Sequence, residues 1–332
     1  MYRTTSIAVL IVALLLAACG GSAGEEGPLV VYSGRSEDLV ASLIERFETE
    51  TGVEVEVRYG DSTELAATLL AEGAATDVDV FFAQDPASLG ATSSLLTRLP
   101  DEVLEAVPAR FRDSSGRWVG TSGRVRVLVY DSERVDPGDL PSSIDQLADP
   151  RWAGQLAIAP TNGSFLAFVA AMILDRGEDA TLEWLEAIAA NEPVDFPGNS
   201  PIVAAADAGE ISIGLVNHYY LLRLQAEGGG SRAANHFLAP GDVGGLVMPA
   251  GAGIVAGSDH PESARRFVEF LLTEESQRYF AEETFEYPLV PGVEPFEGLP
   301  AIDAVVGPDI DLSRLAEALD TATDLVTRAG LL

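Results

Sequence analysis

Short apolar runs alternate with amphipathic helical patterns from residue 29 onward, and this rhythm is typical of the α/β class. Residues 29–32 and 78–83 are typical of buried strands, and residues 53–59 alternate apolar with polar side chains as a half-exposed strand does. Further strands are expected at residues 125–130, 156–159 and 211–216. The sequence therefore predicts an α/β protein.

Local signals also mark where helices begin. Asp61 with Glu64 resembles a capping box, and Asp85 followed by Pro86 is a typical helix start. Residues 245–256 form an apolar, glycine-rich run that is consistent with a strand crossing between lobes. No change of composition marks a linker, which is expected if each lobe is assembled from discontinuous segments.

The first residues predict an exported lipoprotein. Arg3 precedes an apolar run over residues 7–18, which has the length of a signal-peptide core and is shorter than the roughly 20 residues of a membrane-spanning helix. The run leads into Cys19, the only cysteine, in a segment that looks like a bacterial lipobox. We expect residues 1–18 to be removed, Cys19 to carry a lipid, and residues 19–27 to act as a tether. The alternative is a buried thiol in a short core helix.

Charge limits the choice of partners. The chain has 20 basic residues, all of them arginine, against 52 acidic ones, which gives a formal net charge of −32. Such a surface repels nucleic acid and anionic lipid, so we expect neither as a partner. The acids are spread along the chain, and we interpret them as a solubility feature.

Enzymatic chemistry has few candidates here. The sequence contains no P-loop and no zinc-binding His-Glu-x-x-His helix, and its three histidines lack the spacing of metal ligands. No thiol nucleophile follows Cys19. We therefore expect no catalytic activity.

One polar and aromatic segment lies where an α/β protein binds its ligand. Asn217, His218, Tyr219 and Tyr220 follow the predicted strand 211–216 and precede a helical pattern. Ligands of α/β sheets bind beyond the carboxyl ends of strands. Neighbouring side chains at a helix start diverge by about 100°, so both phenols could face one ion. The alternative is ordinary packing of two tyrosine rings.

The chain resembles the ferric-iron-binding periplasmic proteins, the transferrin-like bacterial ferbindins, over nearly all of its mature length. Six segments match the family in the family's order: 31–35, 79–85, 122–126, 160–165, 217–220 and 286–289. The resemblance implies a two-lobed periplasmic-binding-protein type II fold with a hinge. The lobes would comprise residues 28–126 with 247–296, and residues 127–246 with 297–332.

The resemblance also implies a function and partners. The chain would be the extracytoplasmic, lipid-anchored iron-binding component of an ABC importer, in a periplasm or on the outer face of the cell membrane. It would work with a permease and its ATPase, touch the membrane only through Cys19, and be a monomer.

The family's paired tyrosines bind Fe(III) through phenolate oxygens, and Tyr219 and Tyr220 would take that role here. Fe(III) is a hard cation that favours anionic oxygen donors. Some relatives add a histidine and a glutamate, but those positions hold Ser36 and Gln84 in this chain. Gln84, Asp85 and His218 are further candidates for the metal or its surroundings, although Asp85 fits better as a helix cap.

A synergistic anion, carbonate or phosphate, would complete the iron site by the same resemblance. Polar turns before helices and cationic side chains are suited to holding an anion. The candidates are Arg35, Ser36, Arg124, Arg126, Asn162, Gly163, Ser164 and Asn199. Arg126 alternates with apolar positions and would otherwise face solvent.

Three other functions stay open at this point. The first is a binding protein for a small organic or inorganic anion without metal, which would use the same arginines and the turn at Asn162. The second is a lipoprotein that reports a ligand to a sensor kinase, and the third is an enzyme on the same fold.

Overall fold

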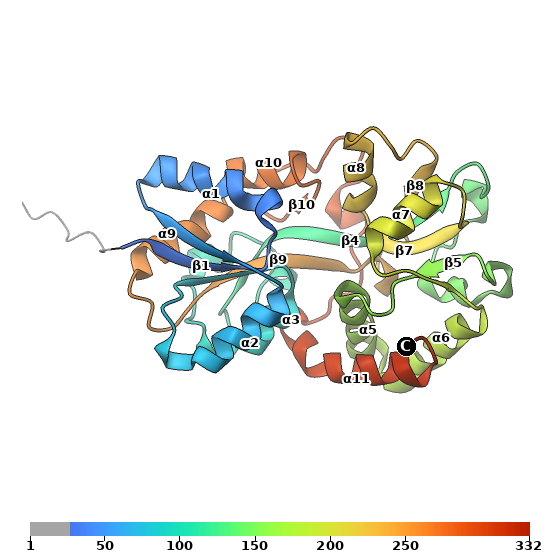
Figure 1. The fold of residues 1–332 in the computed structure, drawn as a ribbon, viewed down its shortest axis with the longest axis horizontal. Coiled ribbons are helices and arrows are strands. Elements are labelled where there is room, and N and C mark those ends of the chain that lie inside the picture. The colour runs from blue at the N-terminus through green and yellow to red at the C-terminus, as the bar shows by residue number, and fades with distance from the viewer. Residues whose placement is uncertain (1–26) are drawn as a thin grey trace, which may run out of the picture.

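The computed structural model describes residues 27–332, and Figure 1 shows two halves joined by long central strands. Hydrogen bonds connect the strands in the order β2-β1-β3-β9-β4-β7-β5-β6, and β8 and β10 each pair with β4. Helices flank these strands, so the predicted α/β class is confirmed. The predicted signal peptide, Cys19 and the tether up to residue 26 lie outside the described residues.

The first half has a parallel centre. β1 (Leu29–Ser33) pairs in parallel with β2 (Val55–Tyr59) and with β3 (Val80–Ala83), and β3 pairs antiparallel with β9 (Val247–Ile254). The helices of this half are α1 (Glu37–Thr51), α2 (Ser62–Glu72), α3 (Pro86–Thr92), α4 (Asp101–Leu104), α9 (Pro261–Leu271) and α10 (Glu274–Glu282).

Two helices of this half begin where the sequence predicts. The Asp61 side chain accepts a hydrogen bond from the backbone N–H of Thr63 at 2.8 Å. The Asp85 side chain accepts one from the backbone N–H of Ser88, also at 2.8 Å. Both carboxylates satisfy N–H groups that the first helical turn leaves without an intrahelical partner.

The long strand β4 (Val119–Asp131) belongs to both halves. It pairs with β9 as far as the Val125–Val247 register, and from Arg126 onward it pairs with β7 (Ile213–Asn217). The strand therefore changes partner between Val125 and Arg126. This switch lies beside the lobe boundary that we predict, and the lobe boundaries themselves stay a prediction.

The second half is arranged around β7. That strand runs parallel to β5 (Leu156–Ile158), which pairs in parallel with β6 (Val194–Asp195). β10 (Tyr287–Pro288) pairs antiparallel with the first-half part of β4, whereas β8 (Ala233–His236) pairs antiparallel with its second-half part. The helices here are α5 (Gly163–Arg176), α6 (Glu178–Ala190), α7 (Asn199–Asp207), α8 (Tyr219–Ala226) and α11 (Leu315–Arg328). α11 packs against α5 and α6, and also against α3 of the first half.

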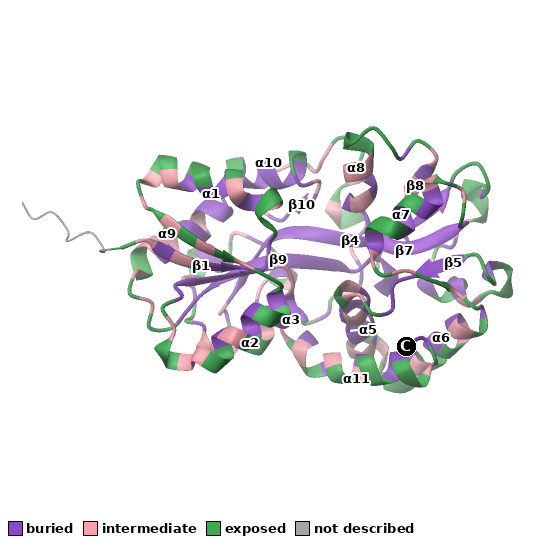
Figure 2. Cartoon of the chain, in the orientation of Figure 1, coloured by how far each residue is buried: buried purple, intermediate pink, exposed green. Residues whose placement is uncertain are grey.

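Burial follows this arrangement. Every residue of β4 is buried, and Figure 2 shows the central strands buried while the outer faces of the helices are exposed. Polar side chains on β4 must therefore find their partners inside the protein. Among residues 27–332, none of the helices combines the length and the apolar character that crossing a membrane requires.

Candidate ligand-binding cleft

The tyrosine pair lies at the junction of β7 and α8. β7 ends at Asn217, His218 lies at the helix boundary, and Tyr219 is the first residue of α8. The rings of Tyr219 and Tyr220 are stacked, with centroids 4.2 Å apart and planes 28° apart. The two rings therefore lie face to face at the helix start, and the expectation that both phenols face one ion stays a prediction.

Only one of the two phenols reaches the cavity beside them. Tyr220 is half-buried and lines a cavity of about 350 Å³, whereas Tyr219 is 4% exposed and packs behind it. Burial, and then the neighbouring Tyr220 phenol, raise the pKa of Tyr219 well above its ordinary value. Without a metal, this phenol stays protonated at neutral pH.

The cavity is formed by both halves of the molecule. From the first half come the turn after β1 and the starts of α2 and α3; from the second come the start of α5, the end of β7 and one face of α11. The lining residues that carry side-chain oxygen or nitrogen are Asp61, Ser62, Thr63, Gln84, Asp85, Arg124, Asn162, Ser164, Asn217, Tyr220, Asp320 and Thr323.

A cradle of neutral polar groups lies at the start of α5. The Asn162 carboxamide oxygen accepts hydrogen bonds from the Ser164 N–H (3.1 Å) and hydroxyl (2.6 Å). The Asn199 amide donates to Asn162 (3.3 Å) and to Ser164 (3.2 Å) from behind. Asn162, Gly163 and Ser164 line the cavity, and Asn199 is buried beneath them. The structure thus brings together these four predicted anion-site residues.

Arg126 extends this cradle with a positive charge. It is 1% exposed, so the alternative in which it faces solvent is wrong, because both faces of β4 are covered. Its guanidinium donates to the Ser164 hydroxyl at 3.2 Å, the Asn217 carboxamide at 3.4 Å and the Leu215 carbonyl at 3.3 Å. Within residues 27–332 its Nε has no partner, and no carboxylate forms an ion pair with it.

This placement changes the acidity of Arg126. Burial lowers its pKa to about 9, and the nearby Tyr220 phenol opposes that change. A buried cation that meets only neutral oxygens is unfavourable until an anion approaches it. The position is therefore suited to an anionic group, either a phenolate or a bound anion.

Arg124 reaches the cavity from the same strand. It is buried and donates to the backbone carbonyl of Gln84. The Gln84 side chain fits best with its oxygen 3.1 Å from Arg124 Nη1 and its nitrogen 3.2 Å from the Gly34 carbonyl. Gln84 therefore lines the cavity while holding Arg124 in place.

Four predicted anion ligands do not line the cavity: Arg126 and Asn199 bond Ser164 of its lining, whereas Arg35 and Ser36 bond none of the cradle residues. Arg35 is fully buried and forms an ion pair with Glu286 at 2.9 Å. Burial raises the pKa of Glu286, but Arg35 and Arg124 lower it by more, so the carboxylate stays ionised. Ser36 is exposed at the start of α1. Neither residue lines the cavity, because Arg35 has its counter-charge inside the first half and Ser36 points out of it.

Two other candidates already have roles in the local structure. His218 is completely buried, and hydrogen bonds occupy both of its ring nitrogens. Asp85 lines the cavity, but its carboxylate caps α3 through Ser88. The interpretation of Asp85 as a helix cap is therefore supported, and His218 has no free nitrogen for a metal in this arrangement.

Some cavity residues escaped the sequence analysis. Asn217 belongs to the segment singled out in the sequence, but it was given no ligand role there. Leu319, Asp320 and Thr323 come from α11, and only tertiary packing brings this helix across the cleft. Within the described chain no group of three or more histidine, cysteine, aspartate or glutamate residues is arranged to hold a metal.

Comparison with known proteins places the chain in a family. A family model described as bacterial extracellular solute-binding protein matches residues 75–306. The Fe(3+)-binding periplasmic protein of Serratia marcescens is 31% identical over 331 residues, covering 98% of this chain and 97% of the relative. The major ferric iron-binding protein of Neisseria meningitidis serogroup B is 31% identical, covering 96% and 98%.

Solved structures agree. Iron-bound HitA from Pseudomonas aeruginosa superposes with a TM-score of 0.83 at 31% identity, covering 91% of this chain and 99% of that one. The Trichodesmium protein IdiA (FutA), solved with iron and citrate, gives a TM-score of 0.83 at 27% identity, covering 92% and 99%. The prediction of a non-enzymatic, extracytoplasmic protein with the type II fold is thereby confirmed. The chain belongs to the family of bacterial extracellular solute-binding proteins and resembles its ferric-iron-binding members.

Proposed function

We propose that this chain captures Fe(III) in the cleft, with Tyr219 and Tyr220 as phenolate ligands and a small anion in the α5 cradle. The observations that carry the proposal are the stacked tyrosine pair beside the cavity and the buried, unmatched cation of Arg126, which bonds Ser164 and Asn217 of the cavity lining. The names of several relatives at about 30% identity point to the same cargo.

The chemistry of the donors agrees with a hard trivalent ion. A phenol has an ordinary pKa near 10, so iron must displace its proton. The raised pKa of Tyr219 makes this displacement harder and ties binding to pH. Iron binding should therefore release protons and weaken as the pH falls.

The anion would lie against the start of α5. Asn162, Gly163 and Ser164 present neutral groups at the end of a helix of 14 residues, and Arg126 adds charge. An N-terminal helix end attracts anions through its free N–H groups and its dipole. Arg124 and Gln84 would border the anion on the side of the first half.

A metal titration tests the proposal directly. Purified protein is stripped of metal and titrated with ferric citrate while the visible spectrum is recorded. We expect a tyrosinate-to-iron charge-transfer band that saturates at one equivalent and is lost in Tyr219→Phe and in Tyr220→Phe. Tyr287→Phe is a matched control, because the buried Tyr287 hydroxyl has no hydrogen-bond partner in the described chain.

The second candidate is capture of a small anion without metal. The unmatched charge of Arg126 favours this candidate, because an anion would stabilise that charge whether or not iron is present. No visible band with ferric citrate, together with thermal stabilisation by phosphate or citrate alone, would select this candidate.

We further propose that the chain is a lipid-anchored, monomeric component of an ABC importer. Cys19 would carry the lipid, and the permease with its ATPase would receive the cargo. Cys19→Ala should move the protein from the membrane fraction to the soluble fraction without changing its ligand affinity. Retention of that variant in the membrane fraction would contradict the anchor.

A further inference from the structure

His218 precedes the tyrosine pair and is bonded to three separate segments. Its ring Nδ1 accepts a hydrogen bond from the Val125 N–H at 3.1 Å. The backbone N–H of His218 donates to the Val125 carbonyl at 2.9 Å. Its Nε2 lies 2.8 Å from the Phe285 carbonyl oxygen. The Asn235 amide donates to the His218 carbonyl at 2.8 Å.

The partners of the ring determine its protonation. A backbone N–H can only donate, so Nδ1 is the acceptor; a carbonyl can only accept, so Nε2 carries the hydrogen. The imidazole is therefore neutral, in one tautomer, with both nitrogens satisfied. Burial is the main reason that the pKa of His218 is lowered to about 4, which agrees with a neutral ring.

The bond to Phe285 uses a strained backbone. Phe285 has φ of 59°, in the left-handed region, and it is one of two non-glycine residues with positive φ in the described chain. Such a conformation is unfavourable for an L-residue, because its Cβ lies too close to the following carbonyl oxygen. Its ring packs edge-on against Phe296, with centroids 4.9 Å apart. Strain of this kind persists where surrounding contacts demand it and is frequent at functional sites.

The three bonded segments meet where the two halves join. Val125 is the last residue of β4 that pairs with β9, and Asn235 lies in β8 of the second half. Phe285 precedes β10, which pairs with β4 inside the first-half sheet. The imidazole thus links the start of α8 to the crossing strand and to the first half. It also contacts the rings of Tyr219 (6.0 Å between centroids) and Tyr287 (4.9 Å).

We propose that His218 is a positioning residue that fixes the direction of the Tyr219 and Tyr220 phenols through its bonds to Val125 and Phe285. The proposal rests on the proposed function of the tyrosine pair. A core residue of similar size would fill the same volume and keep the backbone bonds to Val125 and Asn235, but it would lose both ring bonds. Residues that orient metal ligands from behind typically change metal affinity by about 10- to 100-fold when they are replaced.

Three substitutions separate the two ring contacts. His218→Phe keeps an aromatic ring and removes both hydrogen bonds. His218→Asn keeps an acceptor near the position of Nδ1, and His218→Gln keeps a donor near the position of Nε2. His236→Phe is the matched control, because His236 also bonds a backbone carbonyl, that of Pro141 at 2.8 Å, but lies in β8 and is not adjacent to the tyrosine pair.

Two measurements on the whole protein test the proposal. The first is amide hydrogen exchange without metal, comparing residues 217–222 with residues 128–133. We expect His218→Phe to speed exchange in the first segment only, whereas a general loss of stability would speed both. The second is the ferric citrate titration, in which His218→Phe should shift the charge-transfer band and weaken affinity about tenfold or more.

His218→Asn and His218→Gln should give exchange rates and ferric affinities between those of the wild type and of His218→Phe. His236→Phe should match the wild type in both measurements. Unchanged exchange at residues 217–222 in His218→Phe, or an unchanged band and affinity, would overturn the positioning role. A wild type without any band would contradict the proposed iron function instead, and the exchange measurement would still decide the role of His218.

Discussion

Of the three buried charged residues on β4, Asp131 and Arg126 meet opposite surroundings. Asp131, at its far end, is fully buried, and both of its oxygens accept hydrogen bonds from Arg232 at 2.6 Å. Arg126, five positions earlier on the same strand, lies over the Phe168 ring and forms its hydrogen bonds only to neutral oxygens. The charge at the far end is neutralised within the chain, and the charge at the cleft is not.

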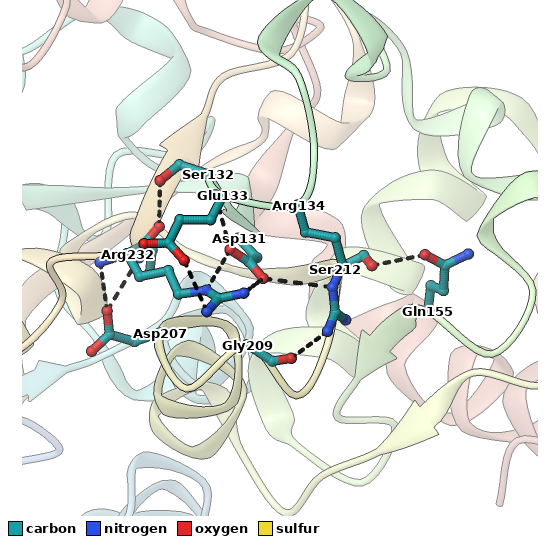
Figure 3. Close-up of polar contacts among 10 residues, drawn as sticks. Asp131, Ser132, Glu133, Arg134, Gln155, Asp207, Gly209, Ser212 and Arg232 are labelled. Atoms are coloured by element: carbon teal, nitrogen blue, oxygen red, sulfur yellow. Dashed lines mark hydrogen bonds and ion pairs between the residues drawn. The ribbon is translucent and has the colours of Figure 1, made fainter.

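Figure 3 shows the polar contacts around Asp131 and Arg232, called here the far network because it lies at the end of β4 away from the cleft. Arg232 also forms an ion pair with Glu133 at 3.0 Å, and Arg134 lies 3.7 Å from Asp131. Asp207 accepts hydrogen bonds from backbone N–H groups, including that of Arg232 at 2.8 Å. Hydrogen bonds from Arg232 lower the pKa of Asp131 despite its burial. A structural charge is thus matched by the fold, whereas a ligand site leaves a charge for the ligand to match.

The largest effect should come from breaking the far network. Arg232→Met leaves Asp131 buried without its main partner, and we expect a loss of about 3 kcal/mol in the free energy of unfolding. Ligand affinity should not change, because the network does not line the cavity. Urea unfolding and ligand titration of the same variant would check both parts. A stability loss well below 1 kcal/mol would mean that the network contributes little.

The same pair predicts a dependence on pH. The lowered pKa of Asp131 means that its stabilisation is fully present above the unfolded value near 3.9 and is lost as the pH falls through the folded value. The stability difference between the wild type and Arg232→Met should therefore be constant near neutral pH and shrink below about pH 4. Urea midpoints measured from pH 7 to pH 3 would show this, and a constant difference throughout would argue against the ionised pair.

Replacing the cleft arginine, Arg126, by methionine should lower ligand affinity and leave stability nearly unchanged, the opposite of Arg232→Met. Arg126→Met removes a buried cation that has no carboxylate partner, so stability should change by less than about 1 kcal/mol or rise. Ligand affinity should fall about tenfold or more, since a charge-assisted hydrogen bond of roughly 1.5–3 kcal/mol is lost. Parallel unfolding and binding measurements of both methionine variants would sharpen the comparison. Equal changes in stability and in affinity in the two variants would contradict the contrast between the two ends of β4.

The smallest effect is expected from an exposed pair. Arg223 of α8 lies 3.2 Å from Asp38 of α1, across the two halves, with both side chains largely in solvent. Such pairs contribute about 0.2–1 kcal/mol and are screened by salt. Asp38→Asn should therefore lower stability slightly at low salt and not at all at high salt, as judged by thermal unfolding. A loss that persists in high salt would show that the pair is stronger than its exposure suggests.

Local chemistry made some features predictable. The strand periodicity, the caps at Asp61 and Asp85 and the position of the tyrosine pair depend on residues a few positions apart. The cradle at Asn162 and Ser164 is likewise a local helix start. The burial of Arg126 was harder to predict, because alternation along a strand does not reveal whether both faces of that strand are covered.

The sequence by itself determined the α/β class, the helix starts and the place of the candidate ligands along the chain, because each depends on short-range periodicity and capping. Only the tertiary structure decided which charges are matched. Arg35 pairs with Glu286, which is 251 positions away, and His218 bonds Phe285, which is 67 positions away. Such pairings depend on how the sheet brings distant segments together, and no local pattern records them.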